Sequence, residues 1–247
     1  MTTSTSVTTT STSPRSSAEA LSASGPNRAR LLGGVVALST GKAEGDLRVP
    51  GARPALTPSR HLELVARPWT MPRQVHSARV LVVDSPSGPL AEEADALVSC
   101  RGDVALAVLG ADCPLIGLSS PEGAFGVVHA GWRGLLAGVV EASAKRLVDL
   151  GASRLEAVVS PFVRVECYPF RRSDAALLAQ RYGEAVLGTS ANGEDALDLE
   201  AVVSAALARV GVPAPVALGG CSACGGQWYS HRARGEAGRH ALVCWQE

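Results

Sequence analysis

Short apolar runs of strand length alternate along this chain with stretches of helical periodicity, and this alternation restricts the fold more than any other feature. The runs expected to form strands are Arg79–Asp84, Val104–Leu109, Phe125–Val128, Leu155–Val159, Val216–Leu218 and Ala241–Trp245. The stretches expected to form helices are Gly134–Leu150, Asp174–Leu187 and a third that begins after an N-cap at Asp198 and ends at Gly211. Such alternation is typical of one α/β or α+β domain and not of two separate folds.

The N-terminal segment differs in composition from the rest of the chain. Its first 24 residues include fifteen Ser or Thr and two charged residues. A segment of this kind cannot bury enough apolar surface to offset the entropy lost when it becomes ordered. We therefore expect residues 1–27 to form a disordered tail and residues 28–247 to form the folded domain.

Charge and hydropathy exclude several classes of protein. Lys plus Arg and Asp plus Glu are equal at 23 each, so no excess positive charge attracts a nucleic-acid backbone. The longest apolar stretch, within residues 104–111, is too short to span a bilayer, and the N-terminus lacks the apolar segment of a secretory signal. Six cysteines in a chain of this length do not indicate a disulfide framework. We expect a cytoplasmic protein with no nucleic-acid or membrane partner.

Three polar motifs lie at the ends of expected strands or just before one. They are Gln74-Val75-His76, Ala111-Asp112-Cys113-Pro114 and His129-Ala130-Gly131-Trp132-Arg133-Gly134. Each His or Cys, taken singly, is more often a hydrogen-bonded or packed residue than a ligand. Strand ends can converge, however, and His76, Cys113 and His129 would then give two imidazoles and one thiolate, the donors of a zinc site with one open position. Arg133, in the first turn of an expected helix, is placed to bind a phosphate or a carboxylate.

Cys221 and Cys224 form a Cys-x-x-Cys pair near the C-terminus. Such a pair can be a redox couple or half of a structural zinc site. No second Cys-x-x-Cys and no nearby pair of histidines completes such a site in the sequence. We therefore favour packing in the core or lining of a pocket for these two residues.

The motifs together resemble those of one protein family. The segments QVH, ADCPL and HAGWRG, the stretch Ser160–Tyr168 and the tail CSACGGQWYSHRARGEAGR resemble the laccase-domain family, whose members are also called multicopper polyphenol oxidase-like, YfiH-type or peptidoglycan editing factor proteins. The resemblance extends from Ala37 to Trp245. It implies a single α/β domain with mixed β-sheets flanked by helices.

The resemblance also implies a metal and a reaction. It implies zinc bound by His76, Cys113 and His129, the same three residues that the positions of the strand ends indicate. The implied chemistry is phosphorolysis of adenosine, inosine, guanosine or methylthioadenosine, and deamination of adenosine. Zinc suits deamination because it lowers the pKa of water towards neutrality. The expected partners are therefore a purine nucleoside and phosphate, and the expected state is a monomer or a small homo-oligomer.

Several side chains near the implied ligands are candidates for substrate binding and catalysis. Arg133, Arg232 and Arg239 are expected to bind phosphate or orient the nucleoside. Tyr229 is a candidate for stacking on the purine, with core packing as the more common use of such a residue. Arg133 is also expected to act in catalysis. Asp112, which precedes the implied thiolate ligand, is expected to orient groups around the metal or to transfer a proton, with a plain loop carboxylate or turn cap as the alternative.

The sequence departs from the family pattern at several positions. Gly41 lies in the stretch that matches an FTTR-like segment, so the Arg of that segment is missing, and the stretch Gly45–Arg60 is shortened. Ser160, Glu166 and Pro169 stand where the family has Gly, Cys and Glu. These changes spare the implied metal ligands and bear on substrate preference and turnover.

Three other functions stay open beside the main hypothesis of a zinc-dependent purine nucleoside phosphorylase and adenosine deaminase. A hydrolase or editing factor for peptidoglycan precursors would use the same zinc, or Cys113 as a nucleophile. A degenerate member would keep the zinc for stability alone. A copper-dependent polyphenol oxidase needs several copper ions bound by many histidines, and the chain has five, at positions 61, 76, 129, 231 and 240. We therefore rank the copper oxidase last.

Overall fold

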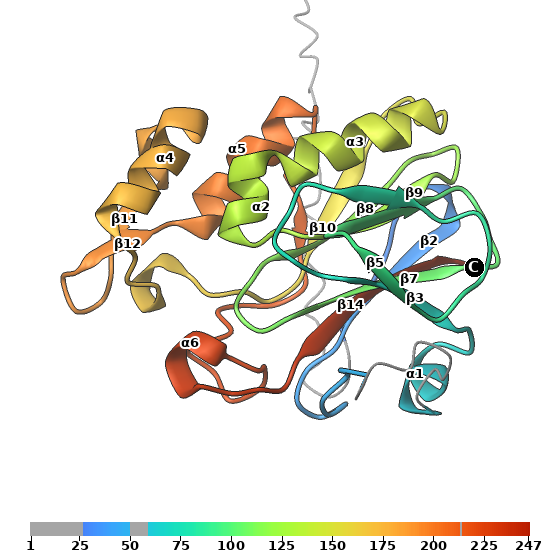
Figure 1. The fold of residues 1–247 in the computed structure, drawn as a ribbon, viewed down its shortest axis with the longest axis horizontal. Coiled ribbons are helices and arrows are strands. Elements are labelled where there is room, and N and C mark those ends of the chain that lie inside the picture. The colour runs from blue at the N-terminus through green and yellow to red at the C-terminus, as the bar shows by residue number, and fades with distance from the viewer. Residues whose placement is uncertain (1–26, 50–58, 213) are drawn as a thin grey trace, which may run out of the picture.

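Two six-stranded β-sheets lie face to face in the computed structural model, which describes residues 27–49, 59–212 and 214–247 (Figure 1). The first sheet has the order β1 (Asn27–Arg30), β2 (Val35–Ser39), β14 (His240–Gln246), β7 (Ala105–Gly110), β3 (Trp69–Arg73) and β5 (Pro89–Glu93). The second has the order β13 (Val216–Ala217), β10 (Glu156–Val159), β8 (Leu115–Ser119), β9 (Phe125–His129), β6 (Ala96–Ser99) and β4 (Val80–Val82). A separate hairpin joins β11 (Leu187–Thr189) to β12 (Asp195–Leu197).

Both large sheets are mixed. In the first sheet, β14 runs antiparallel to β2 and β7, whereas β3 runs parallel to β7 and β5. In the second sheet, β8 is antiparallel to β9 and β10, whereas β4 is parallel to β6 and β10 is parallel to β13. This arrangement confirms the expected α/β class with mixed sheets.

Alternate residues of the central strands pack into different parts of the core. In β14, Leu242 and Cys244 lie between the two sheets, whereas Ala241 and Val243 lie on the outer face of the first sheet. Phe125 of β9 has no exposed surface and also fills the space between the sheets. Because both faces of these strands are buried, their sequences are almost continuously apolar, and this made them recognisable as strands.

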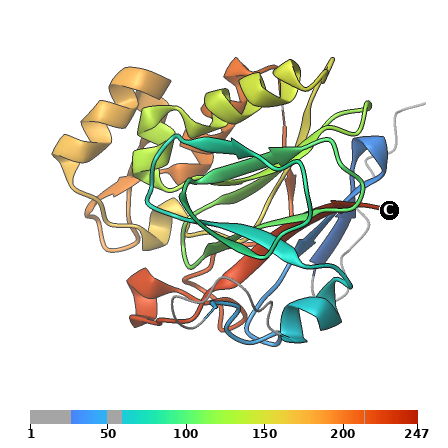
Figure 2. The same cartoon turned by 45° about the vertical axis from the view of Figure 1, so that its right-hand side comes forward.

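Helices cover the outer face of the second sheet (Figures 1 and 2). They are α2 (Trp132–Ala137), α3 (Val139–Asp149), α4 (Arg172–Tyr182) and α5 (Leu199–Arg209), accompanied by the 3₁₀ turns η2 (Val165–Cys167) and η3 (Glu184–Val186). A third 3₁₀ turn, η1 (Leu32–Gly34), precedes β2. The short helices α1 (Ser59–Leu64) and α6 (His231–Arg234) lie on the opposite side of the sandwich from α3 (Figure 1).

The expected helix over Gly134–Leu150 is wrong as a single element. Gly138, with φ 87°, lies in the left-handed region that side-chain-bearing residues avoid, so one helix ends and another begins there. The expected helix over Asp174–Leu187 ends early, before Gly183 at φ 97°. Asp198 is confirmed as an N-cap, because its side chain accepts a backbone hydrogen bond of 3.0 Å from the first turn.

The three residues of the implied metal site lie where the chain leaves or enters the sheets at one end of the sandwich. His76 lies on the link from β3 of the first sheet to β4 of the second. Cys113 lies on the link from β7 of the first sheet to β8 of the second, and His129 is the last residue of β9. The two sheet-to-sheet links and one strand end therefore bring these positions together.

Parts of the expected organisation lie outside the described residues. These are residues 1–26 of the expected tail and residues 50–58 of the shortened stretch. Asn27, the last residue of the expected tail, is the first residue of β1. Within the described residues, no helix has the length and apolar character needed to cross a membrane.

Candidate metal centre

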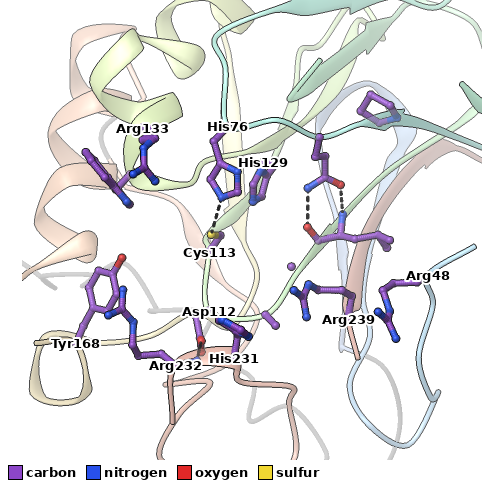
Figure 3. A pocket seen from close by; sticks show the side chains of 16 residues that line it. Arg48, His76, Asp112, Cys113, His129, Arg133, Tyr168, His231, Arg232 and Arg239 are labelled. Atoms are coloured by element: carbon purple, nitrogen blue, oxygen red, sulfur yellow. Dashed lines mark hydrogen bonds between the residues drawn. The ribbon is translucent and has the colours of Figure 1, made fainter. Parts of the chain in front are cut away.

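Three side chains that can bind a metal ion converge at this end of the sandwich: His76, Cys113 and His129 (Figure 3). Their donor atoms all lie within 4.8 Å of one another, and the Sγ of Cys113 is 4.0 Å from the Nε2 of His76. The two imidazole rings meet edge to face, with centroids 4.7 Å apart. The structure therefore brings together the three residues that the sequence grouped.

The buried carboxylate of Asp95, directly before β6, holds both histidines in place. Its Oδ1 lies 2.8 Å from the Nδ1 of His129 and accepts the backbone N–H of His76 at 2.9 Å. Its Oδ2 accepts the N–H and the hydroxyl of Ser77 at 2.6 and 2.9 Å, and the N–H of Val75 at 3.2 Å. Because the Nδ1–H of His129 is donated to this carboxylate, its Nε2 is left for a metal.

The backbone of His76 adopts a conformation that is uncommon for a residue with a side chain. Its φ is 62°, in the left-handed region. The N–H groups of this residue and of both its neighbours donate to Asp95, so one acceptor holds the whole turn. A sparsely populated conformation that several hydrogen bonds enforce is a common feature of sites where a side chain must be precisely placed.

Two other residues of the sequence motifs set the distances between the links. The amide of Gln74 donates to the carbonyl of Leu109 and accepts from its N–H, both at 2.8 Å, and so ties the His76 turn to β7. At Gly131, a Cβ would lie 2.6 Å from the Cδ2 of His76 and 3.3 Å from the Sγ of Cys113. Glycine is therefore required here for the candidate ligands to approach one another.

Cys113 and His129 change each other's ionisation. Burial opposes the charged form of each, but the attraction between thiolate and imidazolium outweighs it. The pKa of Cys113 is thereby lowered to about 6, and the pKa of His129, which is also bonded to Asp95, is raised to about 9. Burial also opposes ionisation of Asp95, but its hydrogen bonds to His129 and Ser77 lower its pKa to about 2. Before an ion binds, the pair at neutral pH is a thiolate and an imidazolium.

This donor set fits a zinc ion. Two neutral imidazoles and one thiolate are ordinary zinc ligands, and three protein ligands leave a fourth position open to the cavity beside them. The hydrogen bond from His129 to Asp95 is the carboxylate support that zinc-binding histidines commonly have. The same donors also accept copper, so the donor set is suited to a metal ion without identifying which one.

The distribution of histidines does not match a multicopper cluster. All five histidines lie in the described part of the chain, and the groups of potential ligands found there contain two of them, His76 and His129. His61 is stacked on Trp69 with ring centroids 4.1 Å apart, and His240 is fully buried at the start of β14. A site with several copper ions would need more histidines in one place.

A cavity of about 650 Å³ opens beside the three donors (Figure 3). This volume lies in the range of small-molecule sites. Its walls carry four guanidinium groups and two aromatic rings, from Arg48, Arg133, Arg232, Arg239, Trp132 and Tyr168. The cavity therefore combines three potential metal ligands with positively charged groups and flat apolar surfaces.

The four arginines are not equally available to a ligand. Arg239 donates from one nitrogen to three backbone carbonyls, and Arg48 is paired with Asp46. Arg133 and Arg232 each lie over an aromatic ring, 4.2 and 4.8 Å from its centroid, and neither has a carboxylate partner within the described residues. The structure thus places all three expected arginines in the cavity wall and leaves Arg133 and Arg232 as its free positive groups.

Asp112 also lines the cavity, but both its carboxylate oxygens are engaged. The hydroxyl of Ser222 donates to Oδ1 at 2.7 Å, and the backbone N–H of Arg232 donates to Oδ2 at 2.6 Å. The carboxylate thereby anchors the first turn of α6, which carries Arg232. These contacts hold α6 and none of the three metal donors, so they favour the turn-cap alternative for Asp112 over a role beside the metal.

Tyr229 does not belong to the residues that line the cavity. Its ring is packed against Gly238, and the ammonium of Lys42 lies 5.7 Å from the ring centroid. The expected stacking of Tyr229 on a purine is therefore not supported. Tyr168, the last residue of the stretch Ser160–Tyr168 that resembles the family, is the tyrosine that lines the cavity.

The interpretation of Cys221 and Cys224 as core or pocket-lining residues is wrong. Cys224 is exposed, Cys221 is partly exposed, and neither is among the residues that line the cavity. Sequence reasoning also missed Asp95. The available signal was that Asp95, the last of three acidic residues in the segment 92–95, directly precedes the apolar residues 96–98, where a charge can be buried only beside hydrogen-bond donors.

Comparisons with known proteins identify the family of this chain and agree with its fold. A family described as multi-copper polyphenol oxidoreductase laccase matches residues 38–247. The protein named purine nucleoside phosphorylase ORF3 from Streptomyces griseus is 39% identical over 195 residues, covering 76% of this chain and 78% of the relative. Adenosine deaminase RL5, from an unknown prokaryotic organism, is 31% identical over 194 residues, covering 72% and 73%. The crystal structure of YlmD from Geobacillus stearothermophilus is similar with a TM-score of 0.73 and 25% identity, covering 92% and 98%.

Replacing Asp95 with Asn is expected to weaken metal binding. The amide keeps the size of the side chain but loses the charge that orients His129. Zinc affinity at this site, measured by competition with a chelator, should fall roughly 10- to 100-fold. Asp198→Asn is the control, because Asn also caps helices and should leave the affinity unchanged. A folded Asp95→Asn protein with unaltered affinity would contradict the role assigned to this carboxylate.

Zinc binding at this site is expected to release a proton. A metal ligand must be deprotonated, and at neutral pH His129 carries the proton that the ion has to displace. The number of protons released can be measured by calorimetry in buffers of different ionisation enthalpy. Near pH 7, zinc binding to wild type should release about one proton more than zinc binding to Cys113→Ala, which lacks this site. The affinity should weaken as the pH falls, because protons compete with the metal. Affinity that does not change with pH, with no proton release, is the contrary result.

Proposed function

This chain belongs to the family described as multi-copper polyphenol oxidoreductase laccase, and on that premise we propose that it is a zinc-dependent enzyme that cleaves purine nucleosides with phosphate and deaminates adenosine. Relatives named purine nucleoside phosphorylase and adenosine deaminase support a role in purine nucleoside chemistry. The observation that carries the proposal is the position of three metal donors beside a cavity whose wall offers free guanidinium groups.

Phosphate binding is supported by Arg133 and Arg232. Each has a guanidinium that faces the cavity without an acidic partner in the described part of the chain. Guanidinium groups bind phosphate through paired, charge-assisted hydrogen bonds. Stacking on an aromatic ring limits the rotamers of both side chains, so less entropy is lost when they bind an anion.

The base is expected to lie against the aromatic part of the wall. Tyr168 is mostly buried, and burial raises the pKa of its phenol to about 12, so the hydroxyl stays protonated and can donate a hydrogen bond. Tyr168 is among the residues that line the cavity, and an aromatic ring is a surface on which a purine can pack. A ribose with its hydroxyls would then extend towards the arginines.

Phosphorolysis makes one bond and breaks another. A phosphate oxygen bonds to C1′ of the ribose while the C1′–N9 bond breaks, and the electron pair passes to the purine, which takes up a proton. Arg133 and Arg232 would hold the phosphate and offset its charge as it approaches the sugar. A zinc ion held by His76, Cys113 and His129 would supply Lewis acidity for negative charge that develops on a bound substrate.

The direct test is to incubate purified protein with adenosine in the presence and absence of phosphate. Adenine should form only when phosphate is present, and inosine should form in either case. Both products should fall by at least about 100-fold in Cys113→Ala, since loss of one ligand disrupts the metal site. Cys100→Ala is the matched control, because this exposed cysteine lies outside the site. Release of adenine without phosphate, or oxidation of phenols on addition of copper in place of either reaction, would overturn the proposal.

Arg133→Gln separates the two reactions. The KM for phosphate should rise roughly tenfold, about 1.4 kcal/mol, the size expected for loss of a hydrogen bond to a charged group. Deamination of adenosine needs no phosphate and should change little. Arg146→Gln, on the exposed side of α3, is the control for loss of one surface charge. Equal losses in both reactions would show that Arg133 does not act through phosphate.

A further inference from the structure

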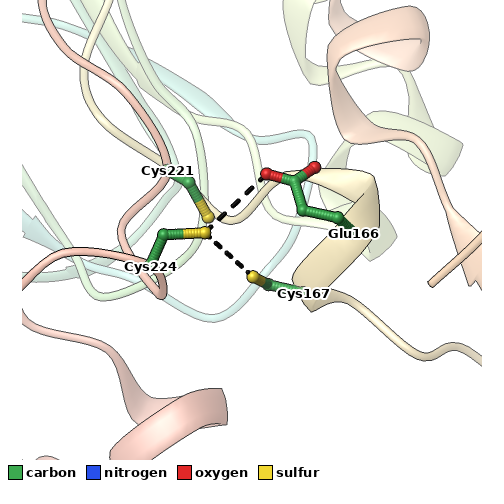
Figure 4. A group of neighbouring side chains, drawn as sticks. All are labelled: Glu166, Cys167, Cys221 and Cys224. Atoms are coloured by element: carbon green, nitrogen blue, oxygen red, sulfur yellow. Dashed lines mark hydrogen bonds between the residues drawn. The ribbon is translucent and has the colours of Figure 1, made fainter. Parts of the chain in front are cut away.

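A second group of potential metal ligands lies outside the cavity. Glu166, Cys167, Cys221 and Cys224 place their donor atoms within 4.8 Å of one another (Figure 4). The Sγ atoms of Cys167 and Cys224 are 3.1 Å apart, and the Sγ of Cys224 is 3.8 Å from the Oε1 of Glu166. Three sulfurs and one carboxylate thus share one small volume.

Backbone contacts bring these residues together from two distant segments. Phe162 and Cys221 form a parallel β-bridge, and the N–H of Ser222 donates to the carbonyl of Phe162 at 3.0 Å. The N–H of Arg164 points at the Sγ of Cys221 at 3.4 Å. Next to this bridge, η2 presents Glu166 and Cys167, and the turn after Cys221 presents Cys224. The cluster is therefore built on paired main chain and not only on flexible side chains.

We propose that Glu166, Cys167, Cys221 and Cys224 bind a second zinc ion, as a structural site with four protein ligands. Three thiolates and a carboxylate are donors that zinc accepts, and sulfur ligands favour it over magnesium or calcium. Two sulfurs bound to one zinc ion at about 2.3 Å lie about 3.8 Å apart, within the spread of the donor atoms here. Four protein ligands leave no open position, which distinguishes this site from the three-donor site of the cavity.

A disulfide between two of these cysteines would explain fewer features of the cluster than a bound zinc ion does. It would use two of the sulfurs and leave the third sulfur and the carboxylate beside it without a role. The carboxylate of Glu166 also stands next to the sulfur of Cys224, where its charge would favour a cation. Glu166 and Cys224 are exposed, so an ion reaches the cluster without unfolding the surrounding core.

A zinc ion at this site would also hold one wall of the cavity in place. Cys167 is followed by Tyr168 in the cavity wall, and Ser222, between the two other cysteines, donates to Asp112 at 2.7 Å. Arg234 of α6 donates to the carbonyls of Ser222 and Ala223 at 3.1 and 2.8 Å. An ion that joins the two segments would therefore hold one wall of the cavity in a single geometry.

Metal counting on the full chain tests this proposal, with zinc supplied and then removed by gel filtration under reducing conditions. Wild type should retain about two zinc ions per chain, Cys224→Ser and Cys113→Ala about one each, and the double variant none. Cys100→Ser should retain two, as a control for loss of a cysteine. Cobalt in place of zinc gives a second measurement, because each thiolate bound to cobalt adds a charge-transfer absorption. The proposed site has three thiolates and the cavity site has one. Cys224→Ser should therefore lose about three times as much of this absorption as Cys113→Ala.

Glu166→Gln tests the cluster with all three sulfurs present. It should weaken zinc binding at this site at least about tenfold while the cavity site keeps its ion, because the amide removes the negative charge that attracts the cation. Equal zinc content in wild type and Cys224→Ser would overturn the proposal. So would a disulfide between two of these cysteines in protein purified with a reductant, shown by four instead of six free thiols after denaturation. Neither result depends on the activity proposed for the cavity.

Discussion

A single buried carboxylate, that of Asp95, organises the end of the sandwich where the candidate metal centre lies. A charge with no exposed surface is costly unless it is fully hydrogen-bonded, and Asp95 accepts from three consecutive backbone N–H groups, one hydroxyl and one imidazole. These hydrogen bonds determine the left-handed turn at His76 and the orientation of His129. The same group therefore contributes to the stability of the fold and positions two metal donors.

The sandwich itself provides the rest of the geometry. The chain passes from the first sheet to the second three times at the same end, and the three links carry His76, Asp95 and Cys113 in turn. Gln74 ties the first and third of these links together through Leu109, and Gly131 leaves room where they meet. The opposite wall of the cavity is made by later segments, which Asp112 and the proposed second zinc site hold together. Buried polar contacts at the edge of an apolar core thus position the donors on one side of the cavity.

The sequence was informative where a pattern had one physical cause. Strands buried on both faces are apolar throughout, so runs such as Ala241–Trp245 were recognisable, and polar motifs at their ends marked the candidate donors. Contacts between residues that lie far apart in the sequence could not be predicted from it. Asp95 has no unusual neighbours in sequence, and Cys167 is 57 residues from Cys224, so neither the supporting carboxylate nor the second cluster could be predicted from spacing. The left-handed backbone conformation of Gly138 ends one helix and begins another, and the spacing of apolar residues in the sequence does not reveal such a conformation.

Anomalous X-ray diffraction from crystals of the zinc-loaded chain, recorded on both sides of the zinc absorption edge, tests the central claim most directly. We predict a zinc ion bound by the Nε2 of His129, the Nε2 of His76 and the Sγ of Cys113, with the Nδ1 of His129 still bonded to Asp95. Zinc bound through the Nδ1 of His129, with the Asp95 contact broken, would contradict the account. So would the absence of an anomalous peak between these three residues.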